Sequence, residues 1–296
     1  MKRILFAVAL LLASAAFAQA APNPEAEVAA AFDAARATMT PGPSDIKIAN
    51  QAVLHLPAGF VFVPTNEAVR LLKAMGNRPG MDVAGMIFPQ EQQPGFVVVR
   101  YIASGYIKDD DAKDWNADEM LTSFKEGTAA SNEERRQRGF PEMEVVGWVE
   151  RPAYDATTHR LVWSMASRDK GSRDAGQGVN YNTYLLGREG YVSMNLVTDL
   201  DAVEAQKPTA RQLLAALEFD KGKGYGDFNS STDRIAEYGL AALIGGVAAK
   251  KLGLFALIAA FALKFAKVIA LAVAGLGTLV WKYVGKKKSG EPPAVS

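Results

Sequence analysis

The sequence predicts an α+β domain, an antiparallel sheet with packed helices, followed by a C-terminal membrane helix or helical hairpin. Runs rich in β-branched and aromatic residues come in consecutive pairs separated by turn residues, which is typical of an antiparallel sheet. Helix-periodic segments lie between these pairs, so helices are expected on one or both faces of the sheet. A long apolar stretch near the C-terminus predicts the membrane segment.

The first predicted elements are two short strands and a helix. Val53–Leu56 and Phe60–Val63 are apolar or alternating runs, and Pro57–Gly59 between them predicts a tight turn. Thr65 is placed to cap a helix that continues to about Met75, where a Gly-Asn pair ends it.

Three further strand pairs are predicted along the chain. Each consists of two β-rich runs around a polar or glycine-containing turn. The pairs are Val83–Phe88 with Phe96–Ala103, Met143–Arg151 with Arg160–Ser167, and Val179–Arg188 with Tyr191–Thr198.

Two more helices are predicted in the same region. Asn116 and Glu119 have the spacing of a capping box and open a long helix to about Arg138. Asp201–Leu217 is expected to be helical in its second half. Pro208 would lie at a start or break, because proline cannot donate a helical hydrogen bond.

The N-terminus has the pattern of a cleavable signal peptide. Lys2 and Arg3 precede an apolar run at Ile4–Ala13, and Ala18–Ala20 offers the small residues of a cleavage site. The predicted organisation is a signal peptide (1–20), a spacer (21–45), a periplasmic α+β domain (46–225), a hinge and amphipathic segment (226–250), a membrane anchor (251–285) and a basic cytoplasmic tail (286–296).

The apolar C-terminal stretch is interrupted by lysines. On one continuous helix most of them would share a face, and those assigned to the membrane anchor are Lys250, Lys264, Lys267 and Lys282. Three arrangements fit this pattern: one spanning helix, a hairpin that turns between the two middle lysines, and a helix lying in the interface. The cluster Lys286–Lys288 favours one crossing, with a cytoplasmic C-terminus and the main domain in the periplasm.

Charge is divided between two segments of the chain. Residues 21–233 carry a net charge of about −8, and the chain beyond them about +7. An acidic body gives no reason to expect nucleic-acid binding, whereas the basic tail suits inner-membrane lipid. The absence of cysteine excludes disulfides, thiol nucleophiles and thiolate metal sites. We expect no cofactor, and an envelope protein as a further partner; the sequence does not fix the oligomeric state.

The densest polar cluster is the candidate binding surface. Its carboxylates and the aromatic–amide pair beside them suit a hard cation or a partner protein. The calcium-loop pattern is not met, and a solvated loop that leads to a helix cap explains the same composition. The candidate residues are Asp109, Asp110, Asp111, Asp114, Trp115 and Asn116.

Other polar motifs give weaker signals. The two histidines, His55 and His159, lack a second ligand at metal-binding spacing, and we assign no catalytic residue and no metal. The run Val179–Tyr184 alternates: if it is a strand, Asn180, Asn182 and Tyr184 share one face. That face is either an aromatic–amide binding face or an ordinary half-exposed strand. The glycine-rich loop at residues 222–226 is interpreted as a flexible hinge.

Several stretches resemble one bacterial family. They are Leu56–Pro64, Ser104–Glu119, Arg138–Pro141, Val146–Trp148, Asn180–Thr183, Gly187–Tyr191, Asn195–Thr198 and Asp233–Gly239. The family is catalogued as a domain of unknown function and described as predicted membrane-anchored proteins. The resemblance extends from about Ala52 to Lys288, and it implies export and anchoring without an established activity. A weaker likeness is to the α/β sandwich of photosystem extrinsic subunits and related stress lipoproteins, which are binding modules; a fold analogy does not establish function.

The preferred hypothesis is a membrane-anchored envelope protein whose periplasmic module binds a partner protein or a ligand without catalysis. One alternative is a membrane-tethered, metal-dependent hydrolase that uses the aspartate cluster. Another is an oligomeric transport accessory assembled through the tail.

Overall fold

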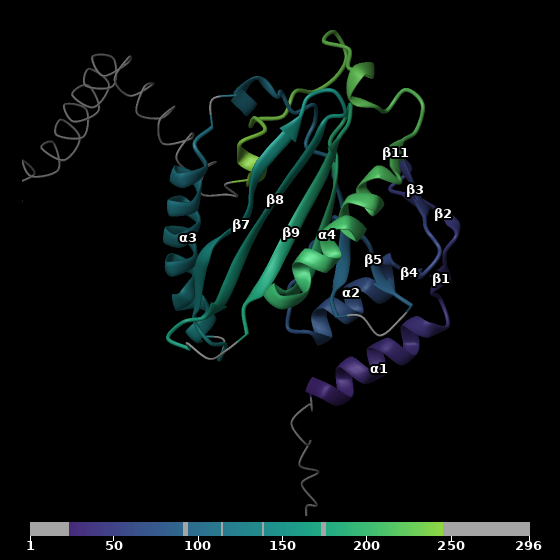
Figure 1. Ribbon diagram of the computed structural model, residues 1–296. Coiled ribbons are helices and arrows are strands. Elements are labelled where there is room, and N and C mark those ends of the chain that lie inside the picture. The colour runs from purple at the N-terminus through teal and green to yellow at the C-terminus, as the bar shows by residue number, and fades with distance from the viewer. Residues whose placement is uncertain (1–23, 91–93, 114, 138, 173–175, 245–296) are drawn as a thin grey trace, which may run out of the picture.

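The computed structural model describes residues 24–90, 94–113, 115–137, 139–172 and 176–244 (Figure 1). The helices are α1 (Pro24–Arg36), α2 (Thr65–Ala74), α3 (Ala117–Gln137) and α4 (Leu200–Ala215), with short 3-10 helices η1 (Asp110–Lys113) and η2 (Tyr225–Asp227). The strands are β1 (Thr40–Pro41), β2 (Ser44–Ile48), β3 (Ala52–Leu56), β4 (Phe60–Pro64), β5 (Val83–Pro89), β6 (Phe96–Ile102), β7 (Met143–Asp155), β8 (Arg160–Asp169), β9 (Gly178–Leu186), β10 (Tyr191–Asp199) and β11 (Leu217–Phe219).

The strands form two antiparallel sheets. The large sheet has eight strands in the order β1-β4-β5-β6-β10-β9-β8-β7, and the small sheet has the order β11-β3-β2. The three predicted hairpins are all present as β5–β6, β7–β8 and β9–β10. The prediction of an antiparallel sheet with packed helices is therefore confirmed.

Side-chain alternation divides the large sheet into two faces, which we name after the helices that pack on them. On the α4 face, residues such as Val99, Tyr181 and Met194 join the largest core cluster. That cluster also contains Leu54 of the small sheet and Leu213 of α4, so α4 and the small sheet together cover this face. Because β6, β9 and β10 lie at the centre of this layer, they contribute to the core along most of their length.

The α3 face is covered at its two ends by separate groups of helices. α1 and α2 pack on β4, β5 and β6 in a cluster that includes Leu71 and Met86. α3 packs at the β7 edge, where Phe124 joins a second cluster with Trp148 and Trp163 (Figure 1). The strands between these groups, β10 and β9, carry polar residues on this face.

β7 is a long edge strand with an irregular ladder. Its pairing with β8 shifts register at three places, between Val145 and Gly147, between Trp148 and Glu150, and between Glu150 and Ala153. Pro152 lies within the last of these irregular stretches. Such bulges bend a strand and leave some of its backbone groups unpaired.

Two local predictions were wrong. The two short strands with a tight turn between them are confirmed as β3 and β4, and the turn carries the chain from the small sheet to the large one. Thr65 does not cap α2; its hydroxyl donates to the carbonyl oxygen of Ala84 at 2.8 Å, which ties the helix to β5. Pro208 lies inside α4, which begins already at Leu200.

The fold prediction was also wrong in its C-terminal part. Among the residues that the structure describes, no helix is both long and apolar enough to cross a membrane. The start of the apolar stretch is used for packing instead: Leu240, Leu243 and Ile244 are buried against α3 and β8 in one cluster. The remainder of the predicted anchor, with Lys250, Lys264, Lys267 and Lys282, lies outside the described residues, as do the predicted signal peptide and basic tail.

A partly buried polar network ties α4 to β7 and yields a stability prediction. The hydroxyl of Tyr181 donates to Glu150 at 3.0 Å, and Arg211 of α4 donates to both. Burial raises the pKa of Tyr181 to about 12. Glu150→Ala should lower the free energy of unfolding by about 1–3 kcal/mol in urea titrations, since the Tyr181 hydroxyl loses its acceptor.

Glu204→Ala is the matched control for this experiment. Glu204 lies on α4 and pairs with Lys207, but its side chain is 75% exposed. The control should change stability by less than about 1 kcal/mol. Equal effects of the two substitutions would contradict a structural role for the network.

Candidate functional site

The predicted aspartate cluster lies between β6 and α3, where it contacts the segment that enters the C-terminal part of the chain. Asp110 and Asp111 begin the 3-10 helix η1. Asp109 and Asp111 bond to different partners, and Asp114 lies outside the described residues. The described residues form no group of three or more histidine or acidic side chains that could hold a metal ion.

Asn116 caps α3, as its spacing from Glu119 indicated. Its side-chain oxygen accepts hydrogen bonds from the backbone N–H groups of Asp118 at 3.0 Å and Glu119 at 3.3 Å. The Glu119 carboxylate accepts a bond from the Asn116 side-chain amide at 3.1 Å. The Asn116 oxygen thus satisfies two otherwise unpaired backbone donors at the helix start, and the bond to Glu119 joins the two side chains. Trp115, next to it, packs partly buried on the cluster beneath α3.

Asp111 holds the beginning of the C-terminal apolar stretch. Its two carboxylate oxygens accept the backbone N–H groups of Leu240 and Ala241, each at 3.1 Å. Gly239 permits this approach, because a Cβ at that position would collide with the Asp111 carboxylate. The carboxylate therefore acts as a capping group for the short turn at residues 240–244.

Asp109 lies in a partly buried cluster with Tyr154 and His159. The Tyr154 hydroxyl donates to Asp109 at 2.7 Å and lies 3.1 Å from the Nδ1 atom of His159. Burial and the hydrogen bond to Asp109 raise the pKa of Tyr154. The His159 ring stacks on Tyr225 with 4.0 Å between ring centroids, and its backbone has a positive φ of 54°. The structure thus joins the predicted Asp109 to a histidine that the sequence left isolated.

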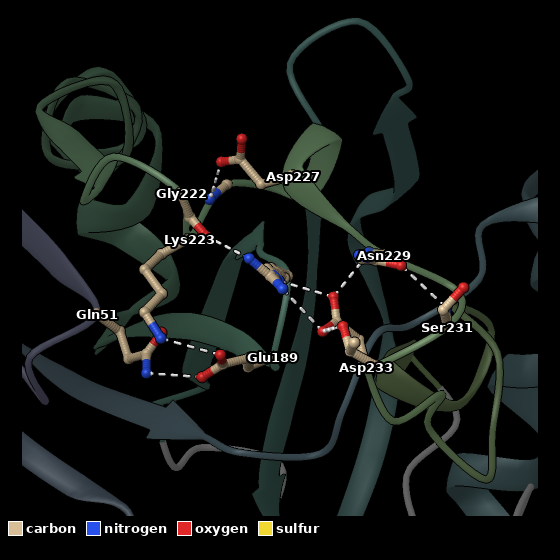
Figure 2. Close-up of polar contacts among 11 residues, drawn as sticks. Gln51, Glu189, Gly222, Lys223, Asp227, Asn229, Ser231 and Asp233 are labelled. Carbon is tan, nitrogen blue, oxygen red and sulfur yellow. Dashed lines mark hydrogen bonds and ion pairs between the residues drawn. The ribbon is translucent and has the colours of Figure 1, made fainter.

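The loop after β11 is clamped to the β9–β10 turn by a bidentate ion pair (Figure 2). The Arg188 guanidinium donates to both oxygens of Asp233, at 2.7 and 2.9 Å. Asp233 also accepts the backbone N–H of Asn229 and the hydroxyl of Thr232. These hydrogen bonds hold the pKa of Asp233 far below its usual range, and the bond from Arg188 has the largest effect.

A second ion pair supports the same loop. Lys223 donates to Glu189 at 2.9 Å, and Gln51 of the small-sheet region donates to the other oxygen of Glu189 at 3.0 Å (Figure 2). The glycine-rich loop interpreted as a hinge is therefore bonded to the body, and Tyr225 within it is buried, with its hydroxyl bonded to the carbonyl oxygen of Ile107.

The predicted alternation of Val179–Tyr184 is present in β9, and the register shows which residues join it. Asn182 lies opposite Asn195, and Tyr184 lies opposite Ser193, which in turn lies opposite Arg100 of β6. Opposed residues of an antiparallel pair share a face. We call the polar side chains of this part of the α3 face the amide band; they are Arg100, Asn180, Asn182, Ser193 and Asn195.

Hydrogen bonds within the chain use only some of the donors and acceptors of the amide band. Asn195 donates to the side-chain oxygen of Asn182, which donates in turn to the backbone carbonyl oxygen of Asn180. The side chains of Asn180 and Ser193 make no hydrogen bond to the residues described. Asn180 and Asn195 are partly exposed, whereas Asn182 and Ser193 are nearly buried.

The sequence indicated only part of this face. It identified Asn180 and Asn182 from their alternation, but it missed Arg100, Ser193 and Asn195 as their neighbours. Those three residues lie on other strands, so only the pairing register brings them together. The signal that a search could use is the pair of polar residues at alternate positions in β10, Ser193 and Asn195.

The capping role of Asp111 can be tested by amide hydrogen exchange. In Asp111→Ala, Leu240 and Ala241 lose their acceptors, so exchange at residues 240–244 should become about tenfold faster or more. Asp110→Ala is the matched control, because Asp110 is exposed and makes no side-chain hydrogen bond within the described part of the chain. Unchanged exchange in Asp111→Ala would show that the cap does not hold this turn.

The low pKa of Asp233 predicts a pH-dependent stability difference. A carboxylate with a lowered folded-state pKa stabilises the fold above its unfolded pKa, about 3.9, and loses this effect as the pH falls further. The stability difference between the native chain and Asp233→Asn should therefore be largest near neutral pH and shrink below about pH 4. Urea unfolding across this range measures it, and a difference independent of pH would refute the role of the ion pair.

Comparison with known proteins identifies a family but no activity. A solution structure of PsbP from the cyanobacterium Synechocystis sp. PCC 6803 is similar, with 10% sequence identity, a TM-score of 0.36, and coverage of 60% of this chain and 92% of that chain. At this TM-score the likeness carries no further argument. None of the curated proteins matches the chain. A family model described as "Protein of unknown function (DUF2167)" matches residues 40–277, which confirms the family expected from the sequence. The chain belongs to this family of unknown function.

Proposed function

We propose that this chain is an exported envelope protein whose α+β domain is a binding module, with its ligand site at the amide band. The observation that carries the proposal is the position of the band. Polar side chains with unused hydrogen-bonding groups occupy the middle of a sheet face whose two ends are covered by the protein's own helices.

The energetic argument rests on what such side chains contribute to folding. Asparagine is unfavourable in strands, and a polar group withdrawn from water without a partner is destabilising. Residues opposite and beside the band, such as Val98 and Trp163, are apolar and packed. An amide at Asn180 therefore adds little to the fold, which supports a role in binding.

Export is the second part of the proposal. It is supported by the signal-peptide pattern at residues 1–20 and is compatible with the absence of cysteine. Retention of the module in the envelope, with its main domain in the periplasm, follows from the same signal and from the basic C-terminal residues.

The aspartate cluster is a weaker candidate for a ligand-binding site than the amide band. Asp111 and Asn116 are used to cap segments of this chain, and Asp109 accepts a bond from Tyr154. A metal-dependent hydrolase would need these oxygens to converge on one point, whereas Asp109 and Asp111 bond to different parts of the fold.

Two threonine substitutions on the same strand and face test the proposal. Asn180→Thr should raise the free energy of unfolding by up to about 1 kcal/mol, because threonine suits a strand and no side-chain bond is lost. Asn182→Thr should lower it by about 1–3 kcal/mol, because Asn182 is buried and its amide is bonded on both sides.

Urea titration of both variants gives the comparison. Stabilisation by Asn180→Thr is the result expected of a residue retained for binding rather than for folding. If Asn180→Thr destabilises the domain as much as Asn182→Thr does, the band is structural and the proposed site is wrong.

A further inference from the structure

We infer that the ligand of the amide band is a neutral carbohydrate chain, an inference that rests on the proposed function. Three properties of the band support it: its charge, the kind of hydrogen bonds it offers, and its place in the sheet.

The band offers no uncompensated charge. Its one cation, Arg100, pairs with Asp82 at 3.3 Å, and both side chains are about one third exposed, at 31% and 36%. The other four members are amides and a hydroxyl. A site that selects an anionic ligand presents unpaired cations, and one that selects a cation presents unpaired carboxylates. The band therefore favours a neutral ligand.

The hydrogen-bonding groups suit hydroxyl groups. A side-chain amide presents donors and an acceptor side by side, and a sugar hydroxyl likewise both donates and accepts. Asn180 and Ser193 have these groups free of bonds to the described residues. Neighbouring strands are about 4.8 Å apart, and alternate residues of a strand are about 6.8 Å apart. Of the amides, those of Asn180 and Asn195 are partly exposed and can meet neighbouring hydroxyls of one ligand, whereas Asn182 and Ser193 are buried behind them.

Aromatic residues lie beside the amides. Trp163 is opposite Asn182 and Tyr184 is opposite Ser193, and both rings are more than nine-tenths buried. The indole N–H of Trp163 has no partner at hydrogen-bond geometry among the described residues. Burial raises the pKa of the Tyr184 hydroxyl. The protein's own side chains cover both rings, so they support the amides from below, and contact with the ligand falls to the partly exposed polar side chains.

The place of the band in the sheet argues against an extended peptide as the ligand. A peptide that adds a strand needs a free sheet edge, where backbone groups are unpaired. β6, β10 and β9 are interior strands whose backbones already pair on both sides. Recognition here must use side chains, as it does for carbohydrates.

Isothermal titration of the purified full-length chain with defined probes tests the inference. The neutral probes are chitotetraose and maltotetraose, and the charged probes are tetra-aspartate and tetra-lysine peptides. We expect binding of a neutral oligosaccharide that depends little on salt and is weakened about tenfold in the double variant Asn180→Ala/Asn195→Ala. Asn77→Ala, at an exposed asparagine outside the band, is the matched control and should bind like the native chain.

The outcomes separate the two proposals. Binding of a charged peptide that is lost in the double variant would overturn the carbohydrate inference and leave the amide band as the binding site. Binding of an oligosaccharide that the double variant does not weaken would overturn both. If neither oligosaccharide binds, the carbohydrate inference is wrong, and the stability comparison of Asn180→Thr with Asn182→Thr decides the proposed function separately.

Discussion

The two faces of the central strands of the large sheet lie in different environments. On the α4 face, β6, β10 and β9 supply side chains to the largest core cluster, among them the fully buried Tyr181. On the opposite face, within the described part of the chain, apolar clusters cover the same strands only at the two ends of the sheet. A shift of register by one residue would exchange the two faces, so the α4 core fixes which side chains form the amide band. The position of the candidate site is thus determined by packing on the other side of the sheet.

Local signals in the sequence were sufficient for the hairpins and most helices. Each hairpin joins neighbours along the chain, and the Asn116 cap is set by residues three positions apart. The small sheet was not predicted as a unit, because its pairing of β3 with β11 joins residues far apart in the sequence. β2 was not predicted: it begins in the last two residues of the predicted spacer, although Ile46 and Ile48 beyond it alternate in the way that a half-buried strand requires.

The candidate sites also depend on contacts between residues far apart in the sequence, which the sequence did not predict. The sequence left two interpretations of the aspartate cluster open, a binding surface and a loop that leads to a helix cap, and in the structure Asn116 and Asp111 accept backbone N–H groups as caps do. It could not supply the partner of Asp111, which lies 129 positions further along the chain. Tyr154 links His159 to Asp109 because the turn between β7 and β8 lies near η1. Such contacts depend on topology rather than on composition.

The irregular edge of the large sheet bears on how the protein avoids association with other copies of itself. An exposed, regular edge strand offers a row of free N–H and C=O groups on which another strand can form a ladder. At thirteen residues β7 is long enough to be such a template. Its three register shifts and Pro152 interrupt the row of backbone groups. The distortion of β7 thus protects the folded domain against edge-to-edge aggregation.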